Sequence, residues 1–170
     1  MAVTNDNPQV AQIRQSVRSS YTRIQQLLDG PLSTLGTEKL YQAPQPGEWS
    51  LMENVAHIIE VMPYWGDEIA KLVATPGQNF GRTHQHEGRL RAIIEHGKDS
   101  LALAKAALPG SYEHLDRILS TLKDSDLALQ GHHAKYGDRD LAWFIKEFVT
   151  QHLDAHINQM ERDISVLHKK

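Results

Sequence analysis

A chain of 170 residues is within the size range of one domain and can bury a hydrophobic core, so we expect a single domain spanning residues 1–170. Its 18 Lys and Arg are outnumbered by 21 Asp and Glu and form no basic block, which argues against nucleic acid as a main partner. The absence of cysteine excludes disulfides, thiolate metal ligands and a cysteine nucleophile, so any metal must bind imidazole or oxygen.

The amino-terminal sequence MAVTNDNPQV lacks the charged and apolar regions of a signal peptide. No apolar run approaches the ~20 residues that a membrane-spanning helix needs. We therefore expect a soluble, cytoplasmic protein that does not associate with a membrane.

The first predicted helix begins at Pro8, because proline suits the first helical turn. Apolar residues then recur at three- and four-residue spacing from Val10 to Leu28, and Gly30 marks the expected end of the helix. The segment 31–48 contains three prolines, so we expect it to be an irregular crossover.

The second predicted helix opens with a capping box made by Ser50 and Glu53. Apolar residues continue the helical spacing beyond it, and Pro63 is expected to kink the helix. After Thr75, the sequence PGQNFGRTHQHEGR has the composition of a loop.

A third helix is predicted over residues 88–108, where Pro109 should end it. A shorter helical piece is predicted over 111–122, followed by a loop, QGHHAKYGDRD, and by a last helix from about Asp138 to the carboxyl terminus. The predicted fold is all-α: a four-helix bundle with a long crossover after the first helix and a short extra helix before the last.

His152 and His156 stand four residues apart in the last predicted helix. With 10 His in the chain, such a pair is by itself a weak motif. The apolar stripe of this helix passes through positions 145, 149, 152, 156 and 160, so both imidazoles should face the core. Two imidazoles one turn apart can bind one metal ion, and without a metal each needs a hydrogen-bond partner.

His57 is the candidate third ligand, because it lies in an apolar segment of the second predicted helix. Neighbouring helices of a bundle lie about 8 to 10 Å apart, so imidazoles from two helices can meet around one ion. A catalytic metal typically has three protein ligands and a position for water or substrate. The alternative is that all three are core histidines, hydrogen-bonded to a carboxylate or a backbone group.

Two segments, GEWSLMENVAHI and QHLDAHINQM, resemble the motifs of the DinB/YfiT-like superfamily of metalloenzymes, and the order of the predicted helices is similar over residues 10–167. The resemblance implies a four-helix bundle in which His57, His152 and His156 bind a divalent metal, usually nickel or zinc, at one end of the core. Some relatives carry a glutamate two residues after the second of the paired histidines. This chain has Asn158 there, which argues against that branch.

Three further residues are second-tier candidates for the mouth of the site: the loop residues His86 and His133, and Tyr64. For the two histidines the alternative is a simple solvated loop residue. Glu53 is explained by its capping role rather than as a fourth ligand. Glu60 is expected to be solvated on the far side of its helix turn.

The sequence has no nucleophile elbow and no glycine-rich phosphate loop. A bound metal lowers the pKa of water or of a thiol and so makes either a nucleophile at neutral pH. The resemblance implies either a thiol transferase or isomerase that uses a low-molecular-weight thiol, or a hydrolase. The second hypothesis is a stress-associated binding or sensing protein with a structural or vestigial metal site. The third is a helical bundle with three hydrogen-bonded core histidines and a surface that binds a partner. A small-molecule substrate is expected, and pairing of helix faces would give a homodimer.

Overall fold

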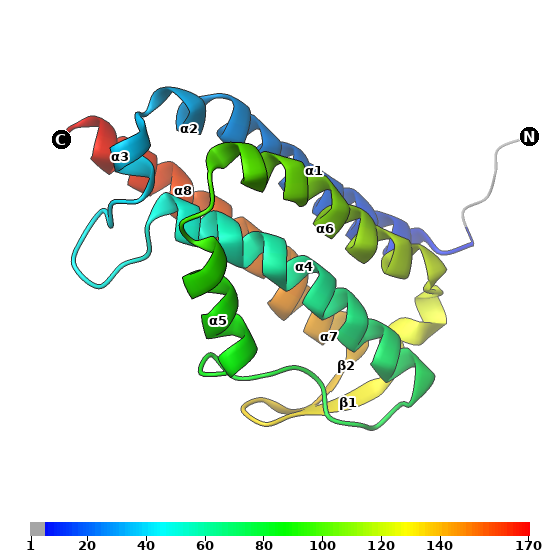
Figure 1. Ribbon diagram of the computed structural model, residues 1–170. Helices are drawn as coiled ribbons and strands as arrows, with labels where there is room; N and C mark the ends of the chain where they lie inside the picture. The colour runs from blue at the N-terminus through cyan, green and yellow to red at the C-terminus, as the bar shows by residue number, and fades with distance from the viewer. Residues whose placement is uncertain (1–5) are drawn as a thin grey trace, which may run out of the picture.

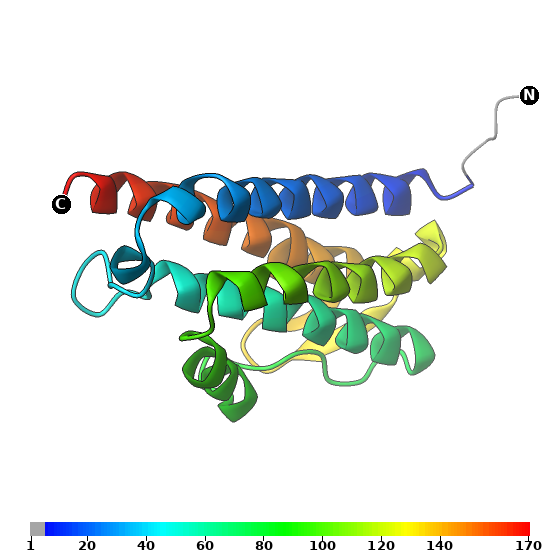
Figure 2. The same ribbon diagram turned by 45° about the horizontal axis from the view of Figure 1, so that its top comes forward.

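The computed structural model describes residues 6–170 as a bundle of four long helical rods (Figure 1). Three rods are α1 (Pro8–Asp29), α4 (Leu51–Ala74) and α6 (Leu101–Thr121). The fourth is continuous and consists of α7 (Leu141–Ile145), the π-helical turn η2 (Lys146–Thr150) and α8 (Gln151–His168). Both α1 and α4 pack against α6 and α8, so α1 and α4 lie on a diagonal (Figure 2). The predicted all-α four-helix bundle is confirmed.

The long crossover from α1 to α4 contains two short helices, α2 (Pro31–Thr34) and α3 (Thr37–Leu40) (Figure 1). The prediction of an irregular segment is therefore wrong for these two turns. Pro31 begins α2 rather than preventing it, and each turn buries one leucine, Leu32 and Leu40, against the core.

The capping box of α4 is confirmed. Ser50 Oγ accepts a hydrogen bond from the Glu53 backbone at 3.2 Å, and Glu53 Oε2 accepts one from the Ser50 backbone at 2.7 Å. Pro63 does not end α4, which continues to Ala74. The carbonyl of Ile59, which Pro63 cannot pair with, accepts a hydrogen bond from Ser111 Oγ at 2.8 Å.

The boundaries predicted for the third helix are wrong. The structure has a short α5 (Glu87–His96) and then α6, which runs through Pro109 without a break. Ser100 caps α6, since its Oγ accepts from the backbone of Leu103 at 3.2 Å. Leucines of α6 are buried on both sides of Pro109, so packing outweighs the backbone hydrogen bond that proline removes. The short extra helix is thus α5, before α6 instead of before the last rod.

The segment QGHHAKYGDRD, predicted as a loop, forms a β-hairpin after the 3₁₀ helix η1 (Asp124–Ala128). Its strands are β1 (Gln130–His133) and β2 (Gly137–Asp140), paired antiparallel from Gln130 opposite Asp140 to His133 opposite Gly137. Backbone hydrogen bonds also join β1 to residues 77–80, the start of the loop after α4. The buried positions of β1 are glycine and histidine, so its sequence shows no alternation of apolar and polar residues, and the strand was not predicted.

The last rod begins at Leu141 rather than near Asp138. Asp140 is the cap, because its Oδ1 accepts a hydrogen bond from the backbone of Trp143 at 2.8 Å. The hairpin therefore leads directly into the rod that carries His152 and His156.

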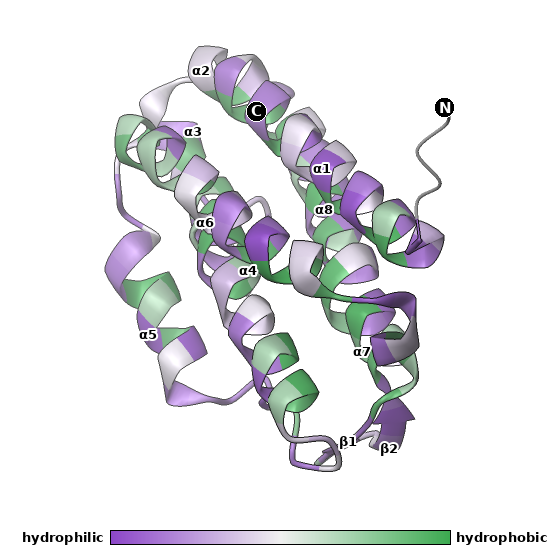
Figure 3. Ribbon diagram, turned by 90° about the vertical axis from the view of Figure 1, so that its right-hand side faces the viewer, coloured by the Kyte–Doolittle hydropathy of each residue, from purple (hydrophilic) through white to green (hydrophobic). Residues whose placement is uncertain are grey.

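The apolar faces of the rods turn toward one another inside the bundle (Figure 3). At the hairpin end the core is aromatic: the ring of Trp65 lies 4.6 Å from Phe148 and 5.6 Å from Phe80, and Phe80 lies 4.3 Å from Phe144. Within residues 6–170, none of the helices has the length and apolar content needed to cross a membrane.

Candidate metal centre

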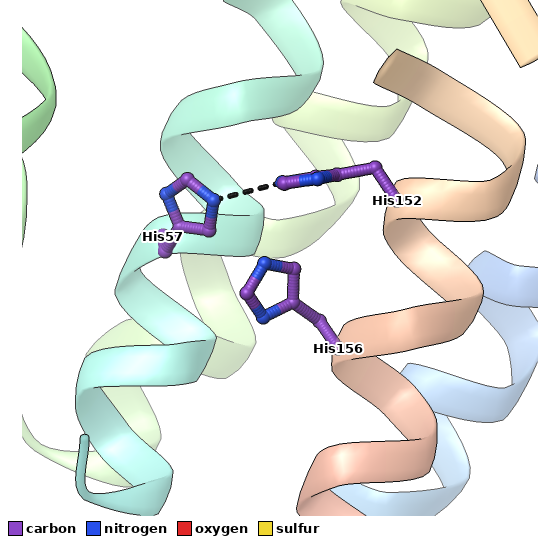
Figure 4. A group of neighbouring side chains, drawn as sticks. All are labelled: His57, His152 and His156. Carbon is purple, nitrogen blue, oxygen red and sulfur yellow. Dashed lines mark hydrogen bonds between the residues drawn. The ribbon is translucent and has the colours of Figure 1, made fainter. Parts of the chain in front are cut away.

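Three histidines from two helices meet at the edge of the core (Figure 4). His57 comes from α4, whereas His152 and His156 lie one turn apart on α8. One ring nitrogen of each lies within 4.8 Å of the other two. The Nε2 atoms of His57 and His152 are 2.9 Å apart. The structure therefore brings together the three histidines that the sequence pattern singled out.

His152 and His156 are less deeply buried than the apolar stripe of the last helix predicted. His57 is 1% exposed, but His152 and His156 are half-buried, and their neighbours Leu153 and Ile157 occupy the central core positions. The π-helical turn η2 directly before α8 is wider than an α-helical turn, so a 3.6-residue stripe cannot be extended through it unchanged. The wider turn leaves the pair at the edge of the core.

The orientation of the His156 ring is fixed by Asn54 of α4. The Nδ2 group of Asn54 donates to the carbonyl of Ser50 at 3.1 Å, which turns its Oδ1 toward His156. That Oδ1 lies 3.0 Å from His156 Nδ1 and must accept, so Nδ1 carries the proton. The lone pair is then on Nε2, which points toward His57 and His152 (Figure 4).

All three imidazoles are neutral at physiological pH. Burial is the main cause that lowers the pKa of His57 to about 2, of His152 to about 3 and of His156 to about 4. Mutual repulsion of the rings adds to the effect on His57 and His152. Neutral imidazoles keep the lone pairs that a metal ion needs.

Glu60 does not lie in solvent on the far side of α4, so that prediction is wrong. Three residues after His57 it shares the same face, and its side chain is 20% exposed. Both oxygens of Glu60 accept hydrogen bonds from Arg82 Nη2, at 2.5 and 2.6 Å, and its Oε2 lies 3.9 Å from His57 Nδ1. A buried ion pair thus stands behind the histidine.

The donor set fits a divalent transition metal. Three neutral imidazoles converge, and imidazole is a preferred ligand of zinc and nickel. His57 Nδ1 is buried and has no hydrogen-bond partner among residues 6–170. When Nε2 is the ligand atom, Nδ1 carries the proton and faces Glu60, as in other metal sites with a carboxylate behind the histidine.

A cavity of about 130 Å³ lies against the cluster. It holds a few water molecules or a small organic group, at about 30 Å³ per water. It is lined from α4, the loop after it, α5, the hairpin and the last rod, by His57, Val61, Trp65, Arg82, Thr83, His84, Arg89, His133, Lys135, Tyr136, Glu147, Phe148 and His152. Two of the three clustered histidines therefore open onto a space where a substrate could bind.

Comparison with known proteins gives the family. The DinB superfamily matches residues 20–160, which include all three histidines. The chain belongs to the DinB superfamily. Its structure is similar to that of YfiT from Bacillus subtilis, described as a probable metal-dependent hydrolase with an unusual four-helix bundle topology, with a TM-score of 0.69 and 14% identity over 97% of this chain and 93% of that one. Curated proteins give no significant match.

Of the second-tier candidates, only His133 lines the cavity of this DinB bundle. It is 3% exposed, and its Nδ1 accepts from the backbone of Lys135 at 3.0 Å, so Nε2 carries the proton. That Nε2 has no hydrogen-bond partner in the described part of the chain. Burial lowers the pKa of His133, and the nearby backbone of Arg82 opposes the shift. His133 thus has a hydrogen-bond donor at the wall of the cavity that His57 and His152 also line.

His86 and Tyr64 are not among the residues that line the cavity. His86 is exposed and caps α5, since its Nδ1 accepts from the backbone of Gly88 at 3.1 Å. The ring of Tyr64 lies 3.8 Å from the guanidinium carbon of Arg82, and burial raises the pKa of its hydroxyl. Tyr64 therefore supports the Arg82 side of the site without reaching the cavity.

Sequence reasoning missed Arg89 and Glu147. The guanidinium carbon of Arg89 lies 4.8 Å from the ring of Trp49, which itself stacks 6.0 Å from His156. Glu147 lies in the π-helical turn and lines the cavity, with no ion pair or hydrogen bond of its side chain to residues 6–170. The loop GRTHQHEGR showed arginines among histidines, but its path to the cluster cannot be inferred without the fold.

Proposed function

We propose that this DinB protein is a metal-dependent hydrolase whose divalent cation is held by His57, His152 and His156. The observation that carries the proposal is the convergence of three neutral imidazoles, within 4.8 Å, beside a cavity. The similar fold of YfiT, which is described as a probable metal-dependent hydrolase, supports it. Zinc and nickel are the proposed metals, because both suit imidazole ligands.

A bound divalent cation would lower the pKa of a water molecule and so make a nucleophile available at neutral pH. The chain supplies the other groups. Glu147 has a free carboxylate at the cavity wall and is the proposed proton acceptor. His133 Nε2–H is the proposed donor to an oxygen of the substrate on which charge develops. Asn54 holds the ring of His156 in orientation, and Glu60 faces Nδ1 of His57 at 3.9 Å.

Water is favoured over a thiol as the nucleophile because of Glu147. Water has the higher intrinsic pKa and benefits more from a carboxylate that takes its proton, whereas a thiol titrates near 8.5 without help. Transfer from a low-molecular-weight thiol is the alternative reaction at the same centre. It predicts that activity depends on an added thiol, which a hydrolase does not need.

The decisive experiment is the metal content of untagged protein, compared with a variant in which His57, His152 and His156 are all alanine. We expect about one nickel or zinc per chain in the wild-type protein and none in the variant. The matched control replaces the same number of exposed histidines, and is His96, His132 and His168 to alanine. Equal trace metal in all three preparations would overturn the proposal.

A second experiment separates an enzyme from a metal-binding protein without catalysis. The metal-loaded protein is assayed with chromogenic carboxylic and phosphate esters, with and without added thiols. We expect turnover that needs the three histidines and no thiol. Full metal loading without turnover of any ester or thiol would favour a stress-associated binding or sensing protein.

A further inference from the structure

Positive charge gathers around the cavity although the chain as a whole has a formal net charge of -3. Arg82, Arg89 and Lys135 line the cavity, and among residues 6–170 that do so Glu147 alone is acidic. The guanidinium of Arg82 is neutralised by Glu60. Lys135 is an exposed residue, so water solvates its ammonium group, which lies 5.0 Å from the ring of Tyr136.

Arg89 is different because it is half-buried without a counter-ion. Its Nη1 donates to the carbonyl of His84 at 2.9 Å, and its guanidinium faces the ring of Trp49. No carboxylate of residues 6–170 forms an ion pair with it. Burial, followed by repulsion from Arg82, lowers the pKa of Arg89, and Glu60, which is paired with Arg82, opposes the shift only in part. A desolvated cation of this kind is stabilised by an anion.

The charge of Arg89 also acts on the three-histidine cluster. Arg89 lines the same cavity as His57 and His152, and its neighbour Trp49 stacks on His156, so its positive charge disfavours a metal cation at the ring nitrogens. The three neutral ligands bring no negative charge of their own. An anion in the cavity would compensate both Arg89 and the metal.

We propose that the cavity binds a small organic anion through its carboxylate or phosphate group, with Arg89 as the residue that recognises it. The planar guanidinium can donate two parallel hydrogen bonds to either group. Trp49 and the His84 carbonyl already hold Arg89 in place, so little side-chain freedom is lost on binding. Hydrolysis of the bound anion rests on the proposed function. Binding of the anion to Arg89 requires no metal.

Calorimetric titration of the metal-free protein tests this directly. The probes are propionate and methyl phosphate, with propionamide as an uncharged match for propionate. We expect both anions to bind and propionamide not to, and we expect Arg89→Gln to weaken anion binding at least about tenfold. Arg89→Lys keeps the positive charge but loses the pair of parallel N–H donors, so its anion affinity should lie between those of the wild-type protein and Arg89→Gln.

The matched control is Arg139→Gln. Arg139 is exposed, and its guanidinium carbon lies 5.3 Å from the ring of Trp143, so the variant also removes one positive charge and one contact with an indole. Arg139 does not line the cavity. Its replacement should leave anion binding unchanged.

Nickel affinity provides a readout that a merely structural role of Arg89 would not produce. Arg89→Gln should bind nickel more tightly than the wild-type protein without anion, because a repelling charge is gone. Propionate should raise the nickel affinity of the wild-type protein, and by linkage nickel should raise its propionate affinity by the same factor. The coupling should vanish in Arg89→Gln, whereas structural damage would weaken both ligands.

The outcomes separate this inference from the proposed function. If the wild-type protein binds neither anion more tightly than propionamide, or if Arg89→Gln binds as well as wild type, the inference is wrong even when nickel binds. If anions bind through Arg89 but no metal binds to the histidines, the proposed function fails and the anion site stands. A preference between propionate and methyl phosphate would identify the anionic group.

Discussion

His57 Nδ1 lies 3.9 Å from Glu60 Oε2, and Arg82 holds both oxygens of that carboxylate. The two residues are three positions apart on α4, so the helix itself sets their spacing. Because His57 Nδ1 is buried and has no hydrogen-bond partner among residues 6–170, Glu60 is the group placed to accept a hydrogen bond from its N–H. Glu60 is therefore a positioning residue for the proposed metal ligand.

Glu60→Gln should bind nickel or zinc about tenfold or more weakly, because the neutral amide is a poorer acceptor for the His57 N–H. The measurement is a metal competition titration, with Glu95→Gln, an exposed residue of α5, as the control. Loss of Glu60 also leaves Arg82 without its counter-ion. The double variant with Arg82→Gln separates the two causes: recovery of full affinity would show that the Arg82 charge, not the lost acceptor, was responsible.

Asn54 has the corresponding role for His156 on the other side of the cluster. Asn54→Leu removes the acceptor at His156 Nδ1 and should weaken metal binding about tenfold or more, because the tautomer is no longer fixed. Asn54→Asp keeps an oxygen in the same place and should bind the metal better than Asn54→Leu. Equal affinity of the two variants, measured in the same titration, would contradict this role.

The sequence predicted the parts of the fold that regular periodicity determines. Val10 to Leu28 and the capping box at Ser50 gave α1 and α4 within a residue or two. Helical positions made His57, His152 and His156 candidates, and the family resemblance gave them as one set. Helix ends that depend on tertiary contacts were not predicted. Pro109 should end a helix by local rules, yet α6 continues because its leucines pack on both sides.

The residues missed at the candidate site depend on long-range structure. Arg89 lines the cavity because the loop after α4 passes beside the hairpin, where residues 77–80 hydrogen-bond to β1. Glu147 faces the cavity from a π-helical turn, which no spacing rule in the sequence indicates. The clustered histidines on regular helices were therefore predictable, whereas the groups that surround them were not.

The buried histidines should make the metal-free protein sensitive to mild acid. Their pKa values are lowered by burial to about 2, 3 and 4, while the unfolded chain binds protons near pH 6.5. The free energy of unfolding should therefore be highest above pH 6.5 and fall as the pH drops below it, by at most about 1.4 kcal/mol per pH unit for each histidine. Urea denaturation between about pH 7.5 and 5 measures the slope.

The pH dependence of the free energy of unfolding can be checked against an exposed histidine of the same chain. His168→Gln, at the exposed end of α8, should leave the pH dependence as it is in the wild-type protein. His57→Leu should reduce it, because one buried group that resists protonation is gone. A slope that is the same in His57→Leu as in His168→Gln would mean that the cluster does not determine the acid sensitivity.

Glu147 tests the choice between water and a thiol. Its carboxylate lines the cavity with no partner among residues 6–170, and Gln has the same shape but cannot accept a proton. In the hydrolysis of the first ester that turns over, Glu147→Gln should lower kcat by about a hundredfold or more with nickel content unchanged, whereas Glu113→Gln, exposed on α6, should not. With a thiol as nucleophile the loss should be smaller, since a thiol gives up its proton more readily. Full activity of Glu147→Gln would show that this carboxylate is not the proton acceptor and would shift the proposal toward thiol transfer.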